Sequence, residues 1–319
     1  MTKVITSFLL FILFWLPLTG AKACDACGCA LGGFNFGTIP QNDSHFVGIR
    51  YAIAQFYAEQ RHGREISHSY DRYQRVDLMA RIALSDRWQL NMVLPYMYNT
   101  MEGSHESEQL SGLADPMLML NYKLLDQKGN PMERWLHNLW FGGGVKAPLA
   151  EFRFSRTEEL VNPNFQLGSG SWDYVFLLNY TAMRKHFGLH VEAVYKYNTL
   201  NSQAYRFGNQ YNMQTNLFYK SALGQWQLFP SAGLYHEFGG QHSHEGFLQG
   251  NSGGRLTMAQ AGVQVQRGNW MMHANGQLPV AQHFFSDAQV EIQAKTRFAF
   301  TFVRFIGKKA DKSVFNWVD

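Results

Sequence analysis

Residues 75–96 alternate between apolar and polar side chains with a period of two, which is the pattern of a β-strand with one apolar face. The apolar positions are Val76, Leu78, Ala80, Ile82 and Leu84, followed by Trp88, Leu90, Met92 and Leu94. The polar segment Ser85-Asp86-Arg87 between the two halves has the composition of a tight turn. This stretch therefore predicts a β-hairpin with one face covered by apolar side chains.

The same alternation recurs to the end of the chain and predicts about twelve strands. Their expected ranges are 44–58, 70–84, 87–99, 113–125, 135–148, 169–183, 187–199, 209–221, 225–239, 254–266, 269–282 and 288–305. Barrels of the bacterial outer membrane are built from an even number of antiparallel strands. The expected fold is therefore all-β, a transmembrane antiparallel β-barrel with up-and-down topology.

The connections between the predicted strands are alternately short and long. Short turns are expected at 85–86, 126–134, 184–186, 222–224 and 267–268, and longer polar loops at 59–69, 100–112, 149–168, 200–208 and 240–253. An aromatic residue follows the short turns, at Trp88, Trp135, Phe187, Trp226 and Trp270. Outer-membrane barrels have short periplasmic turns, long external loops and aromatic girdles at the membrane surfaces. The predicted location is the cell outer membrane, with both termini in the periplasm.

The composition agrees with a membrane barrel. Charged residues make up 16% of the chain and hydrophobic residues 46%, whereas soluble domains contain about 25% charged residues. Beyond the N-terminal region no apolar stretch has the ~20 residues that a transmembrane helix needs. The net charge of +4 is small for 319 residues, and the chain has no basic run with interleaved aromatic residues. Nucleic acid is therefore not an expected partner.

The N-terminal region has the features of a secretory signal peptide. Lys3 precedes an apolar run from Ile5 to Leu18, and the small-residue sequence Ala21-Lys22-Ala23 follows. The expected organisation is a signal peptide at 1–23, a periplasmic cysteine-containing segment at 24–43, the barrel at 44–305 and a tail at 306–319. An alternative is a lipoprotein in which the new N-terminal Cys24 carries the lipid.

The polar faces of the predicted strands contain charges of both signs, which lipid-facing positions tolerate poorly. The predicted pore-lining residues are Arg50, Arg75, Asp77, Arg81, Asp115, Lys123, Lys146, Asp173, Glu192, Lys196, Glu291 and Lys295. The lysines and arginines among them would favour anionic or polar-aromatic solutes. The alternative is that these charges pair with one another and fill the interior without selecting a solute.

All 3 cysteines of the chain lie in the sequence CDACGC, residues 24 to 29. Cys24, Cys27 and Cys29 form a soft ligand set that suits copper or zinc, and three thiolates suit Cu(I) better than structural zinc, which prefers four ligands. The alternatives are a disulfide in the oxidising periplasm and a lipid on Cys24. A weaker metal-binding pair is His242 and His244, two residues apart in a predicted external loop.

Several short phrases resemble an outer-membrane barrel family named for the meta-pathway of phenol degradation. They are Leu94-Pro95, the segment SGLADP at 111–116, GVKAP at 144–148, GSGSWD at 168–173 and Leu278-Pro279. The chain departs from the family pattern at Ala114, where a glycine is usual, and at Leu149-Ala150, where Thr-Gly is usual. The resemblance implies an outer-membrane barrel that passes small, often hydrophobic or aromatic compounds.

The predicted function is an outer-membrane channel or transporter for small aromatic, hydrophobic or anionic solutes. Its expected partners are outer-membrane lipid, the solute, and a periplasmic metal or redox partner of the cysteines. The alternative is a non-conducting scaffold that presents the cysteines or the outer loops to a partner. No catalytic residue is predicted, because most polar side chains are expected to face inward.

Overall fold

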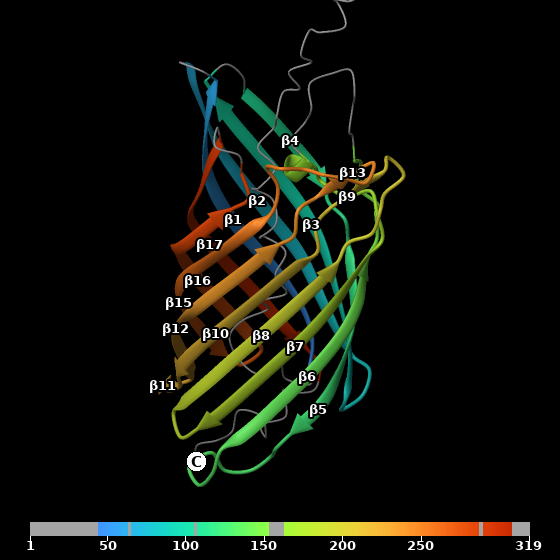
Figure 1. Cartoon of the computed structure of the whole chain (residues 1–319). Helices are drawn as coiled ribbons and strands as arrows, with labels where there is room; N and C mark the ends of the chain where they lie inside the picture. Colours follow the sequence, from blue (N-terminus) through green and yellow to red (C-terminus); the bar gives the residue numbers. More distant parts are fainter. Residues whose placement is uncertain (1–43, 63–64, 105–106, 153–162, 287–289, 308–319) are drawn as a thin grey trace, which may run out of the picture.

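The structure is a computed structural model that describes residues 44–62, 65–104, 107–152, 163–286 and 290–307. Within these residues twelve long antiparallel strands form a closed barrel, in which each strand pairs with the next along the chain and β1 pairs with β17 (Figure 1). The strands are β1 (His45–His62), β2 (Glu65–Ala83), β3 (Trp88–Gly103), β5 (Met117–Asp126), β6 (Leu136–Lys146), β7 (Asp173–Arg184), β8 (Phe187–Tyr197), β10 (Gln210–Tyr219), β12 (Trp226–Gly239), β15 (Gly254–Arg267), β16 (Trp270–Phe284) and β17 (Val290–Ile306). The predicted fold class and up-and-down order are confirmed.

Short elements supplement the barrel. β4 (Ser107–Leu113) pairs with residues 96–102 of β3, whereas β5 pairs with residues 88–93 of the same strand. The single strand predicted at 113–125 is therefore observed as two strands, β4 and β5, of which the first begins at Ser107. Pro116 lies at the interruption and has no N–H to donate to the ladder. The other additions are β11 (Ser221–Leu223), the 3-10 helix η1 (Pro163–Phe165), and a small sheet of β9 (Tyr205–Arg206), β13 (Ser243–His244) and β14 (Phe247–Leu248).

The short turns lie at one end of the barrel, together with the first residue of β1 and the last residue of β17. His45 pairs with Ile306 there. Tight turns at this end use left-handed backbone at Lys185, Gly224 and Gly268, with φ of 52°, 59° and 54°. Glycine adopts this conformation at no steric cost, so two-residue turns of this kind are compatible with the strand twist.

The opposite rim is uneven. β1, β2 and β17 contain 18, 19 and 17 residues, whereas β6, β8 and β10 contain 11, 11 and 10. At ~3.3 Å per residue the first group rises well above the second, and Figure 1 shows the blue strands β1 and β2 extending beyond the green ones. The loops of the low wall therefore lie beside the inner face of the high wall.

The outer face of the barrel is apolar and carries two aromatic girdles. Trp88, Trp135, Phe187 and Trp270 are exposed after the short turns, and Trp226 is half-buried. A second set, which the sequence analysis did not identify, lies at the loop ends of the strands: Tyr96, Trp172, Tyr174, Tyr197, Tyr211 and Phe238. Exposed aromatic rings at both ends of an apolar wall are typical of outer-membrane barrels. Among the described residues no helix has the length and apolar character of a membrane span.

Candidate functional site

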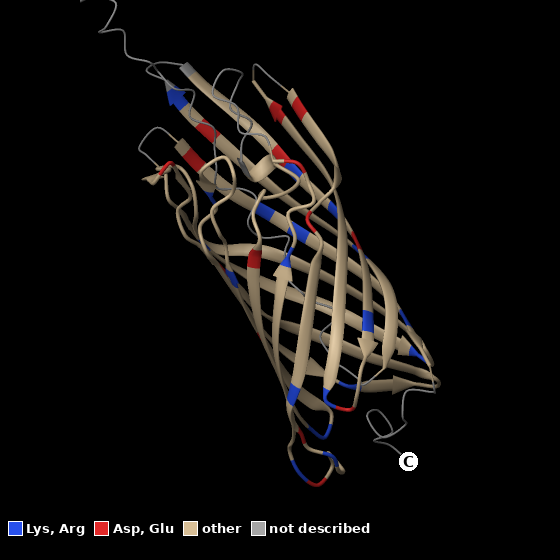
Figure 2. Cartoon of the chain, turned by 90° about the vertical axis from the view of Figure 1, so that its right-hand side faces the viewer, with Lys and Arg blue, Asp and Glu red and all other residues tan. Residues whose placement is uncertain are grey.

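The lumen holds most of the charged residues predicted to line it. Nine of the twelve are at most 7% exposed and lie on the inner face: Arg50, Arg75, Asp77, Arg81, Asp115, Lys123, Lys146, Asp173 and Glu192. Lys196 is half-buried, on the same face of β8 as Glu192. Positively and negatively charged residues are intermixed around the barrel wall, as Figure 2 shows.

The structure differs from the sequence analysis at Glu291 and Lys295, which are exposed on the outer face. Ala54 of β1 pairs with Arg297 and Phe56 pairs with Ala294, so β17 contains one extra residue at this point. Such a bulge shifts the alternation by one residue, so the inward side chains are even-numbered before it and odd-numbered after it. A strict period-two pattern applied to the whole of 288–305 therefore assigns one side of the bulge to the wrong face. Lys295 accordingly lies over the ring of the outward-facing Tyr57, with Nζ 5.4 Å from the ring centroid.

One ion cluster in the lumen joins β1 and β2. Arg50 Nε donates to Asp77 Oδ2 at 2.7 Å, and Arg75 Nε donates to the other oxygen of the same carboxylate. Asp77 is fully buried, and two guanidinium groups hold its carboxylate in place by direct hydrogen bonds. Charge-assisted hydrogen bonds of this kind offset part of the cost of burying these groups away from bulk water.

A second ion cluster brings together three of the short phrases that resemble the family. Lys146 Nζ lies 2.6 Å from Asp115 Oδ2 and 2.9 Å from Asp173 Oδ2. Ser171 Oγ donates to Asp173 Oδ1 at 2.9 Å, and the Ser169 N–H donates to Asp115 Oδ2 at 2.9 Å. Because Lys146 ends β6 and Asp173 begins β7, this cluster fastens segment 168–171 across the loop ends of β5, β6 and β7.

Two further cations of the lumen also have defined partners. Lys123 Nζ lies 3.1 Å from Asp126 Oδ2 and 5.0 Å from the Trp140 ring centroid. Arg81 donates from Nε to Asn91 Oδ1 at 2.8 Å, and its guanidinium lies 4.7 Å from the Phe46 ring centroid. These lumenal cations therefore have defined partners, as the paired-interior alternative expected, and Arg50 and Arg75 share a single carboxylate.

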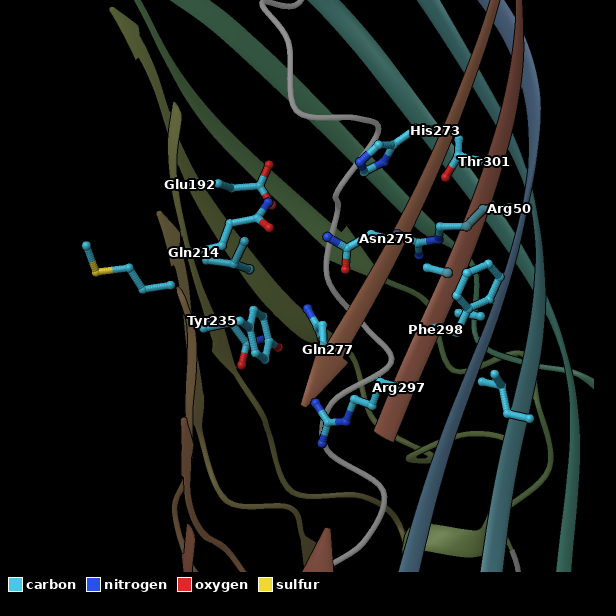
Figure 3. A pocket seen from close by; sticks show the side chains of 16 residues that line it. Arg50, Glu192, Gln214, Tyr235, His273, Asn275, Gln277, Arg297, Phe298 and Thr301 are labelled. Carbon is cyan, nitrogen blue, oxygen red and sulfur yellow. The ribbon is translucent and has the colours of Figure 1, made fainter. Parts of the chain in front are cut away.

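A cavity of about 80 Å³ lies in the lumen between β8, β10 and β12 on one side and β1, β16 and β17 on the other. Figure 3 shows Glu192 and Gln214 on one wall, across from Asn275 and Arg50. Glu192 accepts hydrogen bonds from Asn179 Nδ2 at 3.3 Å and Gln214 Nε2 at 3.2 Å. The cavity walls thus offer amide and carboxylate groups together with the aromatic ring of Tyr235.

The sequence analysis did not select several cavity residues. They are Tyr235, His273, Asn275 and Gln277. Arg297 forms a two-pronged ion pair with Glu237, at 2.8 and 3.0 Å. Tyr235 and Glu237 are two positions apart on β12, as are His273 and Asn275 on β16. The period-two signal could have identified them, since each occupies an inward position of a correctly predicted strand.

Above the cavity the lumen becomes apolar. We call this group the upper lumenal cluster; its buried members are Ala54, Phe56, Ala58, Tyr73, Phe165, Tyr235, Leu256, Met258, Val290, Ile292 and Ala294. Phe165 comes from η1, packs against Tyr73 at a centroid distance of 6.2 Å, and accepts a hydrogen bond from Asn99 Nδ2 on its backbone oxygen at 2.9 Å. The η1 segment therefore occupies part of the mouth of the lumen at the loop end of the barrel.

The two histidines of the weaker predicted metal pair, His242 and His244, both lie against Tyr205. Both rings contact Tyr205, at centroid distances of 5.8 and 6.1 Å, and His242 Nδ1 lies 2.7 Å from the Tyr205 hydroxyl. Burial, reinforced by Lys196, lowers the pKa of His242 to about 3, so this ring is neutral and serves the loop packing. No group of three metal-ligating side chains is found in the described part of the chain. Cys24, Cys27 and Cys29 lie outside the described residues.

Comparison with known proteins identifies the family and the fold. A family model described as "Putative MetA-pathway of phenol degradation" matches residues 56–282. No curated protein matches the chain. An outer-membrane channel from Pseudomonas putida F1 is 14% identical, with 86% of this chain and 99% of that chain covered and a TM-score of 0.59. This similarity supports the barrel fold.

Two other solved structures are similar over most of their length but less well superimposed. The β-domain of the Bordetella autotransporter BrkA is 12% identical, with 82% of this chain and 100% of that chain covered and a TM-score of 0.49. The monoaromatic hydrocarbon channel CymD is 8% identical, with 84% and 90% covered and a TM-score of 0.41.

Proposed function

The chain belongs to the family described as "Putative MetA-pathway of phenol degradation", and we propose that it is an outer-membrane channel for small hydrophobic or aromatic solutes. The closed barrel and the apolar outer face support a place in the membrane. The short-turn end, where both barrel termini lie, is assigned to the periplasm because outer-membrane barrels place their short turns there. The family and the channel-type fold agree with the prediction that the chain is not an enzyme.

The observation that carries this proposal is the division of the lumen into an apolar upper part and a cavity with polar walls below it. The upper lumenal cluster offers apolar surface to an entering solute, and the cavity below offers amides and the Tyr235 ring beside ion pairs that are already compensated. A neutral ring gains from burial of its apolar surface and from contact with guanidinium groups. An anion gains less, because Arg297 is already paired with Glu237, Arg50 with Asp77, and Lys146 with both Asp115 and Asp173. Neutral aromatic solutes therefore fit better than anionic ones.

Planar-bilayer recordings test the proposed function. Purified protein should show ion conductance, and a neutral phenol-type aromatic should block the current as a function of its concentration, because solute in the lumen displaces water and ions. A sugar of similar size should block less, since it gains little from the apolar cluster. Absence of both conductance and aromatic binding would support the scaffold alternative instead.

Glu192→Gln should change ion selectivity without unfolding the barrel. The substitution keeps the side-chain shape and removes the carboxyl group that faces the cavity, and the recordings are made at pH 9 so that this group carries its negative charge in the unaltered protein. One charge at ~4 Å contributes about 1 kcal/mol in a water-like medium, so the anion-to-cation permeability ratio should rise about fivefold. The reversal potential in a KCl gradient measures this ratio. Glu291→Gln is the matched control on the outer face of β17, and an equal shift there would contradict the assigned facing.

Metal binding by the cysteines is a separate part of the proposal and is supported by the motif alone. Reduced protein should retain Cu(I) better than a variant in which Cys24, Cys27 and Cys29 are all replaced by serine. Mass spectrometry of the mature N-terminus distinguishes the alternatives, since a lipid adds mass to Cys24 and a disulfide removes two hydrogens. Equal copper retention by both proteins would eliminate the metal site.

A further inference from the structure

Two basic side chains lie next to each other on the outer face of the barrel at its loop end. Arg255 of β15 pairs with Phe238 of β12 on one side and with His283 of β16 on the other. All three side chains are exposed. Residues paired across neighbouring strands share one face of the sheet, and Phe238 belongs to the outer aromatic girdle. Arg255 and His283 therefore project outward beside that girdle.

Aromatic and polar contacts hold this part of the wall in place. The ring of Phe285 lies 6.3 Å from that of Phe238 and 6.1 Å from that of His283, measured between centroids. The Phe285 N–H donates to the backbone oxygen of Gly253 at 3.1 Å. Both basic side chains are thus carried on backbone that is fixed at the level of the girdle, where lipid headgroups lie.

No carboxylate lies beside these two residues on the outer face. Glu237 precedes Phe238 but faces the lumen, where it pairs with Arg297. In the described part of the chain Arg255 forms no salt bridge, in contrast to the lumenal cations. The outward or exposed residues in the loop-end halves of β12, β15 and β16 are Leu234, His236, Phe238, Arg255, Thr257, Ala259, Leu278, Val280, Ala281 and His283. This surface is therefore complementary to an anion.

The same surface becomes apolar toward the middle of the membrane. Leu234 is 54% exposed, and Leu278 and Val280 are both 59% exposed. The ladder between β16 and β17 ends at Gln277 and Arg297, so Leu278 and Val280 have no strand beside them on that side. A soluble anion makes no use of such a surface. A lipid that joins an anionic headgroup to acyl chains matches both the basic and the apolar part.

We propose that Arg255 and His283 bind a phosphate group of lipid A, the phosphorylated glycolipid of the outer leaflet, and that its acyl chains lie on Leu234, Leu278 and Val280. A guanidinium group presents a planar pair of N–H donors that matches the oxygens of a phosphate. A neutral imidazole adds one N–H donor, and a protonated imidazole adds two. This inference rests on the proposed placement of the loop end outside the cell and concerns a face that the solute does not use.

Binding of diphosphoryl lipid A to the detergent-solubilised protein, followed by native mass spectrometry, tests the proposal. The double variant Arg255→Gln, His283→Gln should raise the Kd at least about tenfold, as expected for the loss of one charge-assisted hydrogen bond. Arg255→Lys should fall in between, because lysine keeps the charge and loses the planar pair of donors. Retention of the heat-modifiable gel band shows that each variant is folded.

Arg267→Gln is the matched control. Arg267 is the exposed last residue of the same strand, and its guanidinium lies 5.1 Å from the Trp226 ring centroid at the short-turn end. This variant should bind lipid A like the unaltered protein. Equal weakening by Arg267→Gln would show that the protein attracts the lipid through its overall charge, and would overturn the site. Equal affinity of the double variant and the unaltered protein would also overturn it.

Two further ligands identify what the basic pair recognises. Lipid A without phosphates should bind the unaltered protein at least about tenfold more weakly than diphosphoryl lipid A, whereas the double variant should bind both lipids alike. Excess inorganic phosphate should leave lipid binding largely intact. Complete displacement of the lipid by inorganic phosphate would show a site for free anions and would overturn the assignment to lipid A.

The proposed channel function is tested separately by ion conductance in planar bilayers. Lipid binding on the outer wall does not require an open lumen, so an unaltered protein that binds lipid A without conducting ions would count against the channel alone. Conductance without phosphate-dependent lipid binding would count against the lipid site alone.

Discussion

Asp77→Asn should destabilise the barrel by about 3–5 kcal/mol, because it leaves two buried guanidinium groups without their shared carboxylate. The Asp77 side chain is 0% exposed and the Arg50 side chain 6%, so water cannot replace the lost charge. The asparagine can still accept one hydrogen bond but cannot offset the charge of Arg50 and Arg75. The midpoint of urea unfolding in lipid vesicles, followed by the heat-modifiable gel band, measures the effect.

Asp86→Asn provides the control for this prediction. Asp86 lies exposed in the short turn before β3, and surface substitutions of this kind change stability by about 0.5 kcal/mol or less. Adding Arg75→Met to Asp77→Asn should restore part of the lost stability, because it removes one of the stranded charges. Unfolding of Asp77→Asn at the urea concentration of the unaltered protein would show that the ion cluster contributes no net stability.

Phe165→Ala should release the η1 segment from the external mouth and raise ion conductance. Phe165 is 1% exposed and packs against Tyr73 inside the high wall. Truncation of a buried phenylalanine costs about 3–5 kcal/mol. A loss of ~3 kcal/mol shifts the equilibrium between the packed and released segment by about two orders of magnitude. Because the segment belongs to a loop, the barrel itself should remain folded.

Single-channel recordings check the Phe165 prediction, and Phe247→Ala is its control. Phe247 belongs to β14 in a neighbouring loop and is 76% exposed, so its truncation should leave the current unchanged. Equal conductance of Phe165→Ala and the unaltered protein would mean that η1 does not limit passage through the mouth.

The strand positions were accessible from the sequence because they depend on neighbours two residues apart. The predicted strand 187–199 is observed as Phe187–Tyr197, and 225–239 as Trp226–Gly239. The aromatic residues after the short turns lie on the outer face for the same local reason. Nine buried lumenal charges were also predicted, since an inward polar position follows directly from the alternation.

The partners of these charges were not accessible in the same way. Asp115, Lys146 and Asp173 are separated by about thirty residues each along the chain and meet only because β5, β6 and β7 are adjacent. The packing of Phe165 against Tyr73 depends on a loop that crosses from the low wall to the high wall. Neither contact leaves a periodic signal in the sequence.

The sequence by itself determined the membrane barrel, its twelve strands and their order, because alternation, turn composition and aromatic placement are local and repeat in every hairpin. Only the tertiary structure decided which charges neutralise one another, where the β17 bulge turns Glu291 and Lys295 outward, and where β16 separates from β17. These features depend on the register between strands and on closure of the wall. Closure joins β1 to β17, residues from the two ends of the barrel, and no local pattern can specify how such distant segments align.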